Sequence, residues 1–205
     1  MKSNVFCLAI FMIINIHVST AQSGFEQYYY VQKNTAPLFV PIIHVQGKHN
    51  WFTKVRYNYE EQNSMSVFAG KSFSRKADLL EYSIEPIAGG VLGQFNGGLL
   101  GLNALFDYGD FFLHTQSQFT FSSQNKCANF FFGWYELGYS PLPWFSFGCS
   151  LQQSVYGQSE KNSTEPGVML GFSFGKWSFP MYAFRPLNTN PYVVLGVSHL
   201  LAVKK

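Results

Sequence analysis

Residues 167–185 read GVMLGFSFGKWSFPMYAFR and decide the fold class of this 205-residue chain. Large apolar side chains at every second position from Val168 alternate with Gly, Ser or Met, which is the period of a β-strand with two different faces. Gly175-Lys176 forms a short break, and a second aromatic run starts at Trp177. The segment therefore predicts a β-hairpin with strands at 167–174 and 177–185.

The same pattern runs through the rest of the chain. Segments rich in Phe, Tyr, Val and Leu are separated by clusters of Gly, Asn, Pro, Ser and Asp, and none shows the spacing of an amphipathic helix. The chain is therefore predicted to be all-β, with about twelve strands and ten as the alternative count. The expected strands are 28–32, 39–46, 51–59, 65–72, 80–92, 99–106, 111–122, 130–139, 144–156, 167–174, 177–185 and 192–200.

The connections between these strands alternate in length. Those at 47–50, 108–110, 140–143 and 175–176 are tight, whereas those at 123–129, 157–166 and 186–191 are longer and polar. Such alternation is typical of an antiparallel up-and-down transmembrane β-barrel. The segment 73–79 departs from it, because a long connection falls where a short turn is expected.

Composition separates this barrel from other protein classes. The chain has 22 Phe, 12 Tyr and 4 Trp, and its aromatic content of 19% exceeds its charged content of 12%. Soluble domains carry about a quarter charged residues. After the N-terminal segment no apolar run reaches the roughly 18 residues of a membrane helix. The net charge of +3 is spread thinly, which argues against nucleic acid as a partner.

The N-terminus has the features of an export signal. Lys2 precedes an apolar run over 5–16, and the small residues Ser19-Thr20-Ala21 follow it. We expect a secretory signal peptide over 1–21, cleaved before Gln22, because the apolar run is short for a membrane anchor. The mature chain, 22–205, is then a single barrel domain. Its first part, 22–37, is either a flexible N-terminal segment or the first strand.

Alternation alone does not say which face is inside. In 51–59 the face of Trp51 and Val55 is apolar, and the opposite face carries Lys54 and Arg56. A soluble lipocalin-like barrel would turn the apolar face inward. Its outer face would need many charges, but here the polar faces hold mostly Ser, Gly, Gln and Asn. We therefore expect the polar face to line the lumen and the apolar face to contact outer-membrane lipid.

This assignment places five charged side chains inside the barrel as a lumen charge network: Lys54, Arg56, Glu81, Glu85 and Glu136. It also sends four polar side chains inward: His114, Gln116, Gln118 and Gln152. Two interpretations are open. The charges form ion pairs that fix strand packing, or they form a selectivity or ligand site, which requires an open path through the barrel.

The sequence gives no catalytic, metal or cofactor motif. The histidines are scattered without metal-ligand spacing. His114 and Ser117 point to opposite faces of one predicted strand, so no local pair suggests a nucleophile and its base. Cys127 falls in a polar loop and Cys149 in mid-strand, and no disulfide is expected between them. We predict that the protein is not an enzyme.

Several segments resemble small outer-membrane β-barrel proteins of Gram-negative bacteria. Residues 47–51 (GKHNW), 56–60 (RYNYE) and 171–177 (GFSFGKW) are similar to uncharacterised barrels of the Bacteroidetes group, as is the signal ending before Gln22. The resemblance implies a barrel but no activity. One departure is the C-terminus, which reads LAVKK at 201–205, where such barrels commonly end in an aromatic residue.

We therefore expect a monomeric, non-enzymatic outer-membrane barrel that serves as a structural or binding barrel or as a narrow pore for small solutes. A secreted or periplasmic lipocalin-like lipid carrier is the alternative function. A lipid-modifying barrel enzyme is the third.

Overall fold

The computed structural model describes residues 23–125, 128–157, 162–188 and 190–201, and these form thirteen β segments and a short 3-10 turn at Lys48–Asn50. The expected signal peptide over 1–21 and Cys127 lie outside the described residues. The segments are β1 Ser23–Gln32, β2 Leu38–Gln46, β3 Trp51–Tyr57, β4 Ser64–Lys71, β5 Phe73–Ala77, β6 Leu80–Gly93, β7 Gly97–Tyr108, β8 Phe111–Ser122, β9 Phe130–Leu142, β10 Phe145–Tyr156, β11 Ser163–Phe174, β12 Trp177–Phe184 and β13 Tyr192–Leu201.

The thirteen segments make twelve strands, because β4 and β5 are one strand interrupted at Ser72. β4 pairs with residues 87–93 of β6, and β5 pairs with residues 80–84 of the same strand. The Ser72 amide still donates to the Asn50 carbonyl at 2.9 Å, and its hydroxyl lies 2.7 Å from that of Ser83. The expectation of a long connection at 73–79 is therefore wrong, since only residues 78–79 form the turn.

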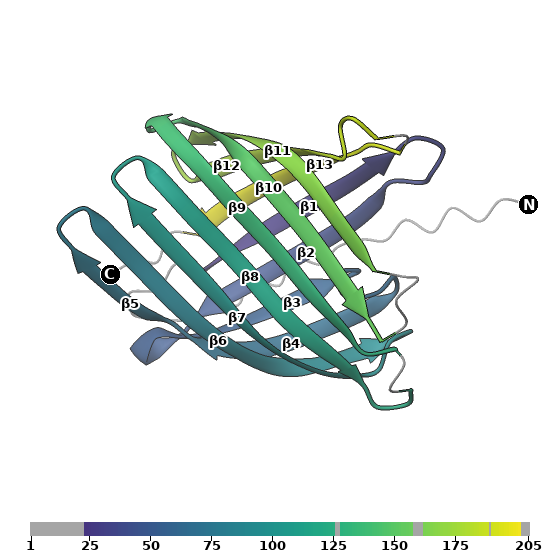
Figure 1. Ribbon diagram of the computed structural model, residues 1–205. Coiled ribbons are helices and arrows are strands. Elements are labelled where there is room, and N and C mark those ends of the chain that lie inside the picture. The colour runs from purple at the N-terminus through teal and green to yellow at the C-terminus, as the bar shows by residue number, and fades with distance from the viewer. Residues whose placement is uncertain (1–22, 126–127, 158–161, 189, 202–205) are drawn as a thin grey trace, which may run out of the picture.

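The sheet closes on itself. Consecutive strands pair antiparallel around the barrel, and β1 pairs with β13 from Ser23 opposite Leu201 to Gln32 opposite Tyr192. Figure 1 shows the tilted strands wrapping around one lumen. The strand at 28–32 predicted from sequence thus begins earlier, at Ser23, and is the closing strand. This result confirms the prediction of an all-β antiparallel up-and-down barrel of twelve strands.

The two ends of the barrel differ. Two-residue turns at 78–79, 109–110, 143–144 and 175–176 lie at the end where β1 begins and β13 finishes, and three of them are seen at the left of Figure 1. The longer connections at 33–37, 58–63, 123–129, 157–162 and 185–191 lie at the opposite end. We call these the turn end and the loop end. The turn end also holds the four-residue connection at 47–50 and the loop end a three-residue one at 94–96, so the alternation holds at every connection except these two.

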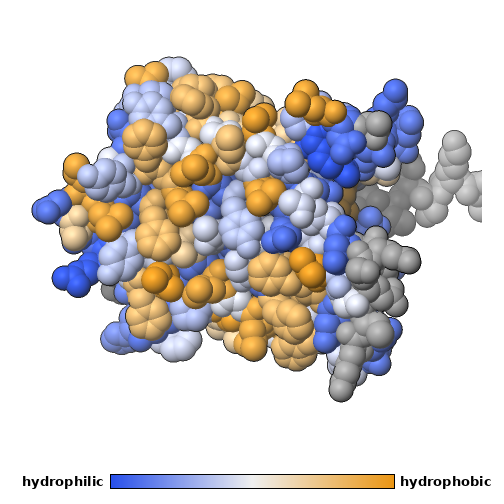
Figure 2. Space-filling view, viewed as in Figure 1, coloured by the Kyte–Doolittle hydropathy of each residue, from blue (hydrophilic) through white to orange (hydrophobic). Residues whose placement is uncertain are grey.

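The outward face of the barrel is apolar and the inward face is mixed. Large apolar side chains are exposed on strand after strand, including Ile43, Leu100, Leu137, Phe147 and Val168. Figure 2 shows apolar residues gathered over the middle of the barrel wall, with hydrophilic residues toward both ends. A soluble carrier needs the reverse arrangement. The fold therefore gives no support to the lipocalin-like alternative.

Two apolar clusters fill part of the lumen. One contains Phe52, Phe68, Ile87, Val91, Phe95, Leu99 and Phe130, and the other contains Met169, Tyr182, Phe184, Tyr192 and Val194. Inward glycines give these side chains room. A Cβ on Gly89 would lie 2.3 Å from the Val67 carbonyl oxygen and 2.4 Å from Phe68 Cβ.

Among the described residues no helix is long and apolar enough to cross a membrane.

Candidate functional site

A cavity of about 480 Å³ occupies the half of the lumen near the turn end. Its walls come from β1, β2, β3, β4, β6, β7, β8 and β9, and from Tyr59 in the β3–β4 turn. The side chains reach the lumen because strand alternation puts every second residue inside. Charged residues dominate the polar wall: Glu26, Lys54, Arg56, Glu85 and Glu136.

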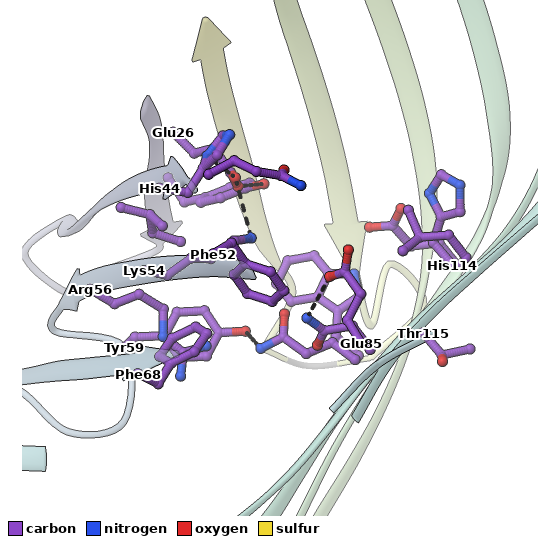
Figure 3. A pocket seen from close by; sticks show the side chains of 18 residues that line it. Glu26, His44, Phe52, Lys54, Arg56, Tyr59, Phe68, Glu85, His114 and Thr115 are labelled. Atoms are coloured by element: carbon purple, nitrogen blue, oxygen red, sulfur yellow. Dashed lines mark hydrogen bonds and ion pairs between the residues drawn. The ribbon is translucent and has the colours of Figure 1, made fainter. Parts of the chain in front are cut away.

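Glu26, His44 and Lys54 form one group on three neighbouring strands. Lys54 Nζ lies 3.8 Å and His44 Nδ1 lies 3.6 Å from Glu26 Oε1. Figure 3 shows the three side chains converging from one wall of the cavity. The Lys54 side chain keeps 27% of its surface exposed, so this ion pair is open to the cavity.

Arg56 is held on every side. Its guanidinium pairs with the Glu60 carboxylate and lies 2.7 Å from Gln118 Oε1, while Nε donates to the Ser66 hydroxyl at 3.3 Å. The same group stacks on the rings of Tyr59 and Phe68, at 4.1 and 4.4 Å from their centroids. Only 3% of the Arg56 side chain is exposed. We call Arg56, Glu60 and Gln118 the sealed cluster.

The turn between β3 and β4 carries Glu60 into the barrel. Asn58 and Asn63 bracket it with positive φ angles of 58° and 53°, a conformation that Asn adopts more readily than most residues. The Asn63 amide donates to Asn58 Oδ1 at 2.8 Å, which fixes the bend. Tyr59 and Glu60 therefore fold back over Arg56.

Tyr59 separates two spaces in the lumen. It lines the large cavity and also a second space of about 160 Å³ near the loop end. Its hydroxyl accepts a hydrogen bond from Gln116 Nε2 at 2.7 Å. Burial raises the pKa of Tyr59, which lies in the turn outside the strands, so the hydroxyl stays protonated.

The facing wall holds two carboxylates that accept hydrogen bonds from neutral groups. Glu136 accepts a bond from the Tyr182 hydroxyl at 2.8 Å, and Glu85 accepts one from Asn103 Nδ2 at 3.4 Å. His114 Nε2 lies 3.2 Å from Asp107 Oδ1 toward the turn end. The cavity is consequently rich in negative charge, because neither Glu85 nor Glu136 forms a salt bridge within the described part of the chain.

Six of the nine residues predicted from sequence line this one cavity: Lys54, Arg56, Glu85, His114, Gln116 and Glu136. Gln118 lies just behind them as a member of the sealed cluster. Gln152 is inside the barrel but on the opposite wall near the loop end, where its Oε1 lies 3.0 Å from the Tyr192 hydroxyl.

The prediction that Glu81 belongs to the lumen network is wrong. Its side chain is 57% exposed and pairs with Lys76 at 3.0 Å on the β5–β6 hairpin. Glu81 lies on the predicted inward face of the strand, but it is the second residue of β6 and is next to the turn at 78–79. The alternation along a strand gives the face to which a side chain points, and it does not give how deep that side chain lies in the barrel.

Sequence reasoning missed Glu26 and Glu60. Glu26 lies two residues before Tyr28, in the segment 22–37, for which the sequence predicts either a flexible segment or the first strand. Extending the alternation of Tyr28 and Tyr30 backward by one step would have found it. Glu60 had no such signal except the two asparagines that bracket its turn.

No group of three or more His, Cys, Asp or Glu suited to a metal ion is found in the part of the chain that the structure describes. His114 contacts Asp107, and among the described residues no serine hydroxyl is within hydrogen-bond distance of it. Ser117 turns instead toward the hydroxyl of Tyr135 at 3.4 Å. The reading as a lipid-modifying enzyme gains no support.

Two solved porin structures share this architecture. The KdgM porin in complex with disordered oligogalacturonate matches with a TM-score of 0.65 and 13% sequence identity, over 87% of this chain and 99% of that one. The NanC porin matches with a TM-score of 0.59 and 10% identity, over 87% and 100%. At such identities the likeness shows the fold alone. No protein-family model and no curated protein matches the sequence.

Proposed function

We propose that this chain is a non-enzymatic outer-membrane barrel that passes small solutes through a narrow lumen and favours cations over anions. The observation that carries the proposal is the charged cavity inside a closed barrel whose outward face is apolar. Lipid requires an apolar outward band and a closed sheet, and charge in the lumen tunes which solutes pass.

The sign of the lumen charge supports the cation preference. Glu26, Glu85 and Glu136 line the cavity against Lys54 and Arg56, and Glu60 adds a fourth carboxylate beside Arg56. Galacturonate, named with the KdgM porin, carries a carboxylate and would be repelled here. Acidic oligosaccharides are therefore not the proposed solutes of this chain.

Location and assembly are part of the same proposal. The turn end is assigned to the periplasm and the loop end to the cell exterior, because short turns of such barrels are periplasmic. A monomer is sufficient, since the β1–β13 and β4–β6 pairings close the sheet. Export through a cleaved signal peptide and an origin in the Bacteroidetes group stay predictions. Finding the protein in the outer-membrane fraction with Gln22 as its first residue would support the export route.

The test is single-channel recording of refolded protein in planar bilayers. We expect discrete conductance steps in KCl, and smaller steps for Glu85→Gln/Glu136→Gln, because losing the two carboxylates lowers the local K⁺ concentration. Glu81→Gln is the matched control, since that carboxylate lies exposed on the rim. Folded protein that shows no steps would overturn passage through the lumen, and equal steps in both variants would overturn the role of the cavity carboxylates.

A further inference from the structure

Two cations lie on the outward face of the barrel, where lipid is expected. Lys71 is the last residue of β4 and Arg75 lies in the middle of β5, and they are directly opposite Trp51 and Tyr82. The Lys71 ammonium lies 5.7 Å from the centroid of the Trp51 ring and 5.4 Å from that of the Phe73 ring. Lys71, Phe73 and Arg75 therefore share one face at two-residue steps, and we call them the outward row.

The outward row differs from the rest of the barrel wall. Within the part of the chain that the structure describes, every other charged residue lies at an inward-facing strand position or in a connection between strands. A charge on the lipid face of a barrel strand is strongly destabilising in the middle of the bilayer and much less so near its surface. The row is therefore expected at the level of the lipid head groups.

The position of the row along the barrel agrees with that level. Trp51 is the first residue of β3, directly after the connection at 47–50, and Arg75 lies three residues before the turn at 78–79. β5 and this turn lie at the turn end, at the left of Figure 1. Tryptophan is enriched at the boundary between lipid and water. Trp51 thus marks the interface, and Lys71 lies over its ring.

The two cations have no counter-charge in the barrel wall. The side chains of Lys71 and Arg75 form no hydrogen bond and no salt bridge with any residue that the structure describes. The carboxylate of Glu81, on the neighbouring strand, belongs to the opposite face and pairs with Lys76 at 3.0 Å. Two positive charges consequently face the lipid side unpaired.

Toward the middle of the barrel, the same face of β4 is apolar. Val67 and Met65 follow Lys71 on this face and are each 42% exposed. A ligand on this surface meets cations near the turn end and an apolar wall beyond them. A free phosphate ion would use only the cations, whereas a lipid with an anionic head group uses both. A zwitterionic head group brings a cation of its own, which Lys71 and Arg75 repel.

We infer that the outward row binds an anionic phospholipid of the leaflet at the turn end, with its phosphate at Lys71 and Arg75 and its acyl chains along β4. The inference rests on the membrane location given in the proposed function, and it does not depend on the passage of solutes.

The test is native mass spectrometry of folded protein in detergent, titrated separately with phosphatidylglycerol and phosphatidylcholine that have identical acyl chains. We expect the wild type to bind phosphatidylglycerol more tightly by roughly 30-fold at low salt, since each cation near an anionic lipid contributes a factor of about 5. Equal affinity for the two lipids would overturn the inference.

Charge variants locate the preference on the barrel. Lys71→Gln/Arg75→Gln removes both charges of the row and should abolish most of the preference for phosphatidylglycerol. Lys33→Gln/Lys176→Gln is the matched control, because it removes the same net charge from exposed residues in the connections at 33–37 and 175–176. The control should keep the preference. A preference that survives in the folded row variant, or that falls equally in the control, would overturn the site.

Trp51 reports where the lipid binds. In a Trp144→Phe/Trp177→Phe background Trp51 is the remaining tryptophan on the outward side, since Trp134 lines the cavity and the chain has 4 Trp. Phosphatidylglycerol with brominated chains, as a minor component of phosphatidylcholine bilayers, should quench Trp51 fluorescence more than the same amount of brominated phosphatidylcholine. Adding Lys71→Gln/Arg75→Gln should remove this difference. Equal quenching by the two brominated lipids in the parent background would contradict the inference.

Single-channel recording separates the two proposals. Lys71→Gln/Arg75→Gln should conduct like the wild type, because both cations lie outside the lumen. Selective binding of phosphatidylglycerol by a barrel that never conducts would leave the outward row standing and overturn the passage of solutes. A conducting barrel without lipid preference would leave the proposed function standing and overturn the outward row.

Discussion

Two ion pairs of the barrel, whose cations Lys54 and Arg56 lie two positions apart on β3, behave differently. Lys54 and Glu26 lie 3.8 Å apart with more than a fifth of each side chain exposed to the cavity. Arg56 and Glu60 are almost completely buried, and Arg56 is further bound to Gln118 and Ser66. The first pair is open to the cavity, and the second is sealed into the wall of the same cavity.

The difference shows that burial decides what a lumen charge does. A buried ion pair is stabilising only when every charge has its partner, so Arg56 and Glu60 fix the β3–β4 turn in place. An ion pair that is open to solvent contributes little to stability, but its charges set the local electrostatic potential that a solute meets. One strand therefore contributes a buried structural charge and, on the proposed function, a charge that acts on solutes, at neighbouring inward positions.

The largest effect is expected from breaking the sealed cluster. Arg56→Met leaves the Glu60 carboxylate buried without its cation, and should lower the free energy of unfolding by about 3–5 kcal/mol. Urea unfolding in detergent, followed by loss of heat-modifiable migration on a gel, measures this loss. Arg56→Met/Glu60→Leu removes both charges and should recover much of the stability. If the single variant is as stable as the wild type, the pair is not structural.

A second effect concerns the boundary between the two halves. Tyr59→Ala removes the side chain that lines both the cavity and the second, smaller space near the loop end, so the two spaces should join. Single-channel conductance should rise relative to the wild type. Phe119→Leu, on the outward face, is the control and should leave conductance unchanged. An unchanged Tyr59→Ala conductance would place the narrowest point elsewhere.

A smaller change in stability is expected from the open pair. Lys54→Met should change the free energy of unfolding by less than about 1 kcal/mol, because the pair is partly exposed. It should increase the preference for K⁺ over Cl⁻, since Glu26 loses its cation. Reversal potentials and urea unfolding measure the two quantities. A stability loss as large as that of Arg56→Met would show that the open pair and the buried pair contribute equally to the free energy of unfolding.

The smallest effect is expected at the rim. Glu81 and Lys76 pair at 3.0 Å, but both side chains are more than half exposed. Glu81→Gln should change the free energy of unfolding by less than about 0.5 kcal/mol and leave ion selectivity unchanged. A shift in selectivity like that of the cavity carboxylates would mean that the rim also filters solutes.

Much of this fold was predictable from the sequence, because its signals are local. They are the alternation of apolar and polar residues along each strand and the Gly, Asn and Pro residues in the connections between strands. Alternation also gave the facing direction of Lys54, Arg56 and Glu136 correctly. The break at Ser72 was not predictable, since it follows from β4 pairing with β6 beyond the β5–β6 hairpin, and that pairing is not local.

The site was predictable only in part, because depth and backbone bends are properties of the closed barrel. Glu81 and Glu85 share a face, yet only Glu85 is deep enough to reach the cavity. Glu60 follows the predicted strand and enters the lumen only because the chain bends at Asn58. Glu26 needed the first strand to be recognised from its start.

The most direct test of the central claim is the reversal potential of the wild-type barrel in a KCl gradient across a planar bilayer. The excess of carboxylates in the turn-end half predicts a potential of the sign that K⁺ preference gives. A potential of the opposite sign would contradict the account, because it would mean that Lys54 and Arg56, and not the carboxylates, control what passes.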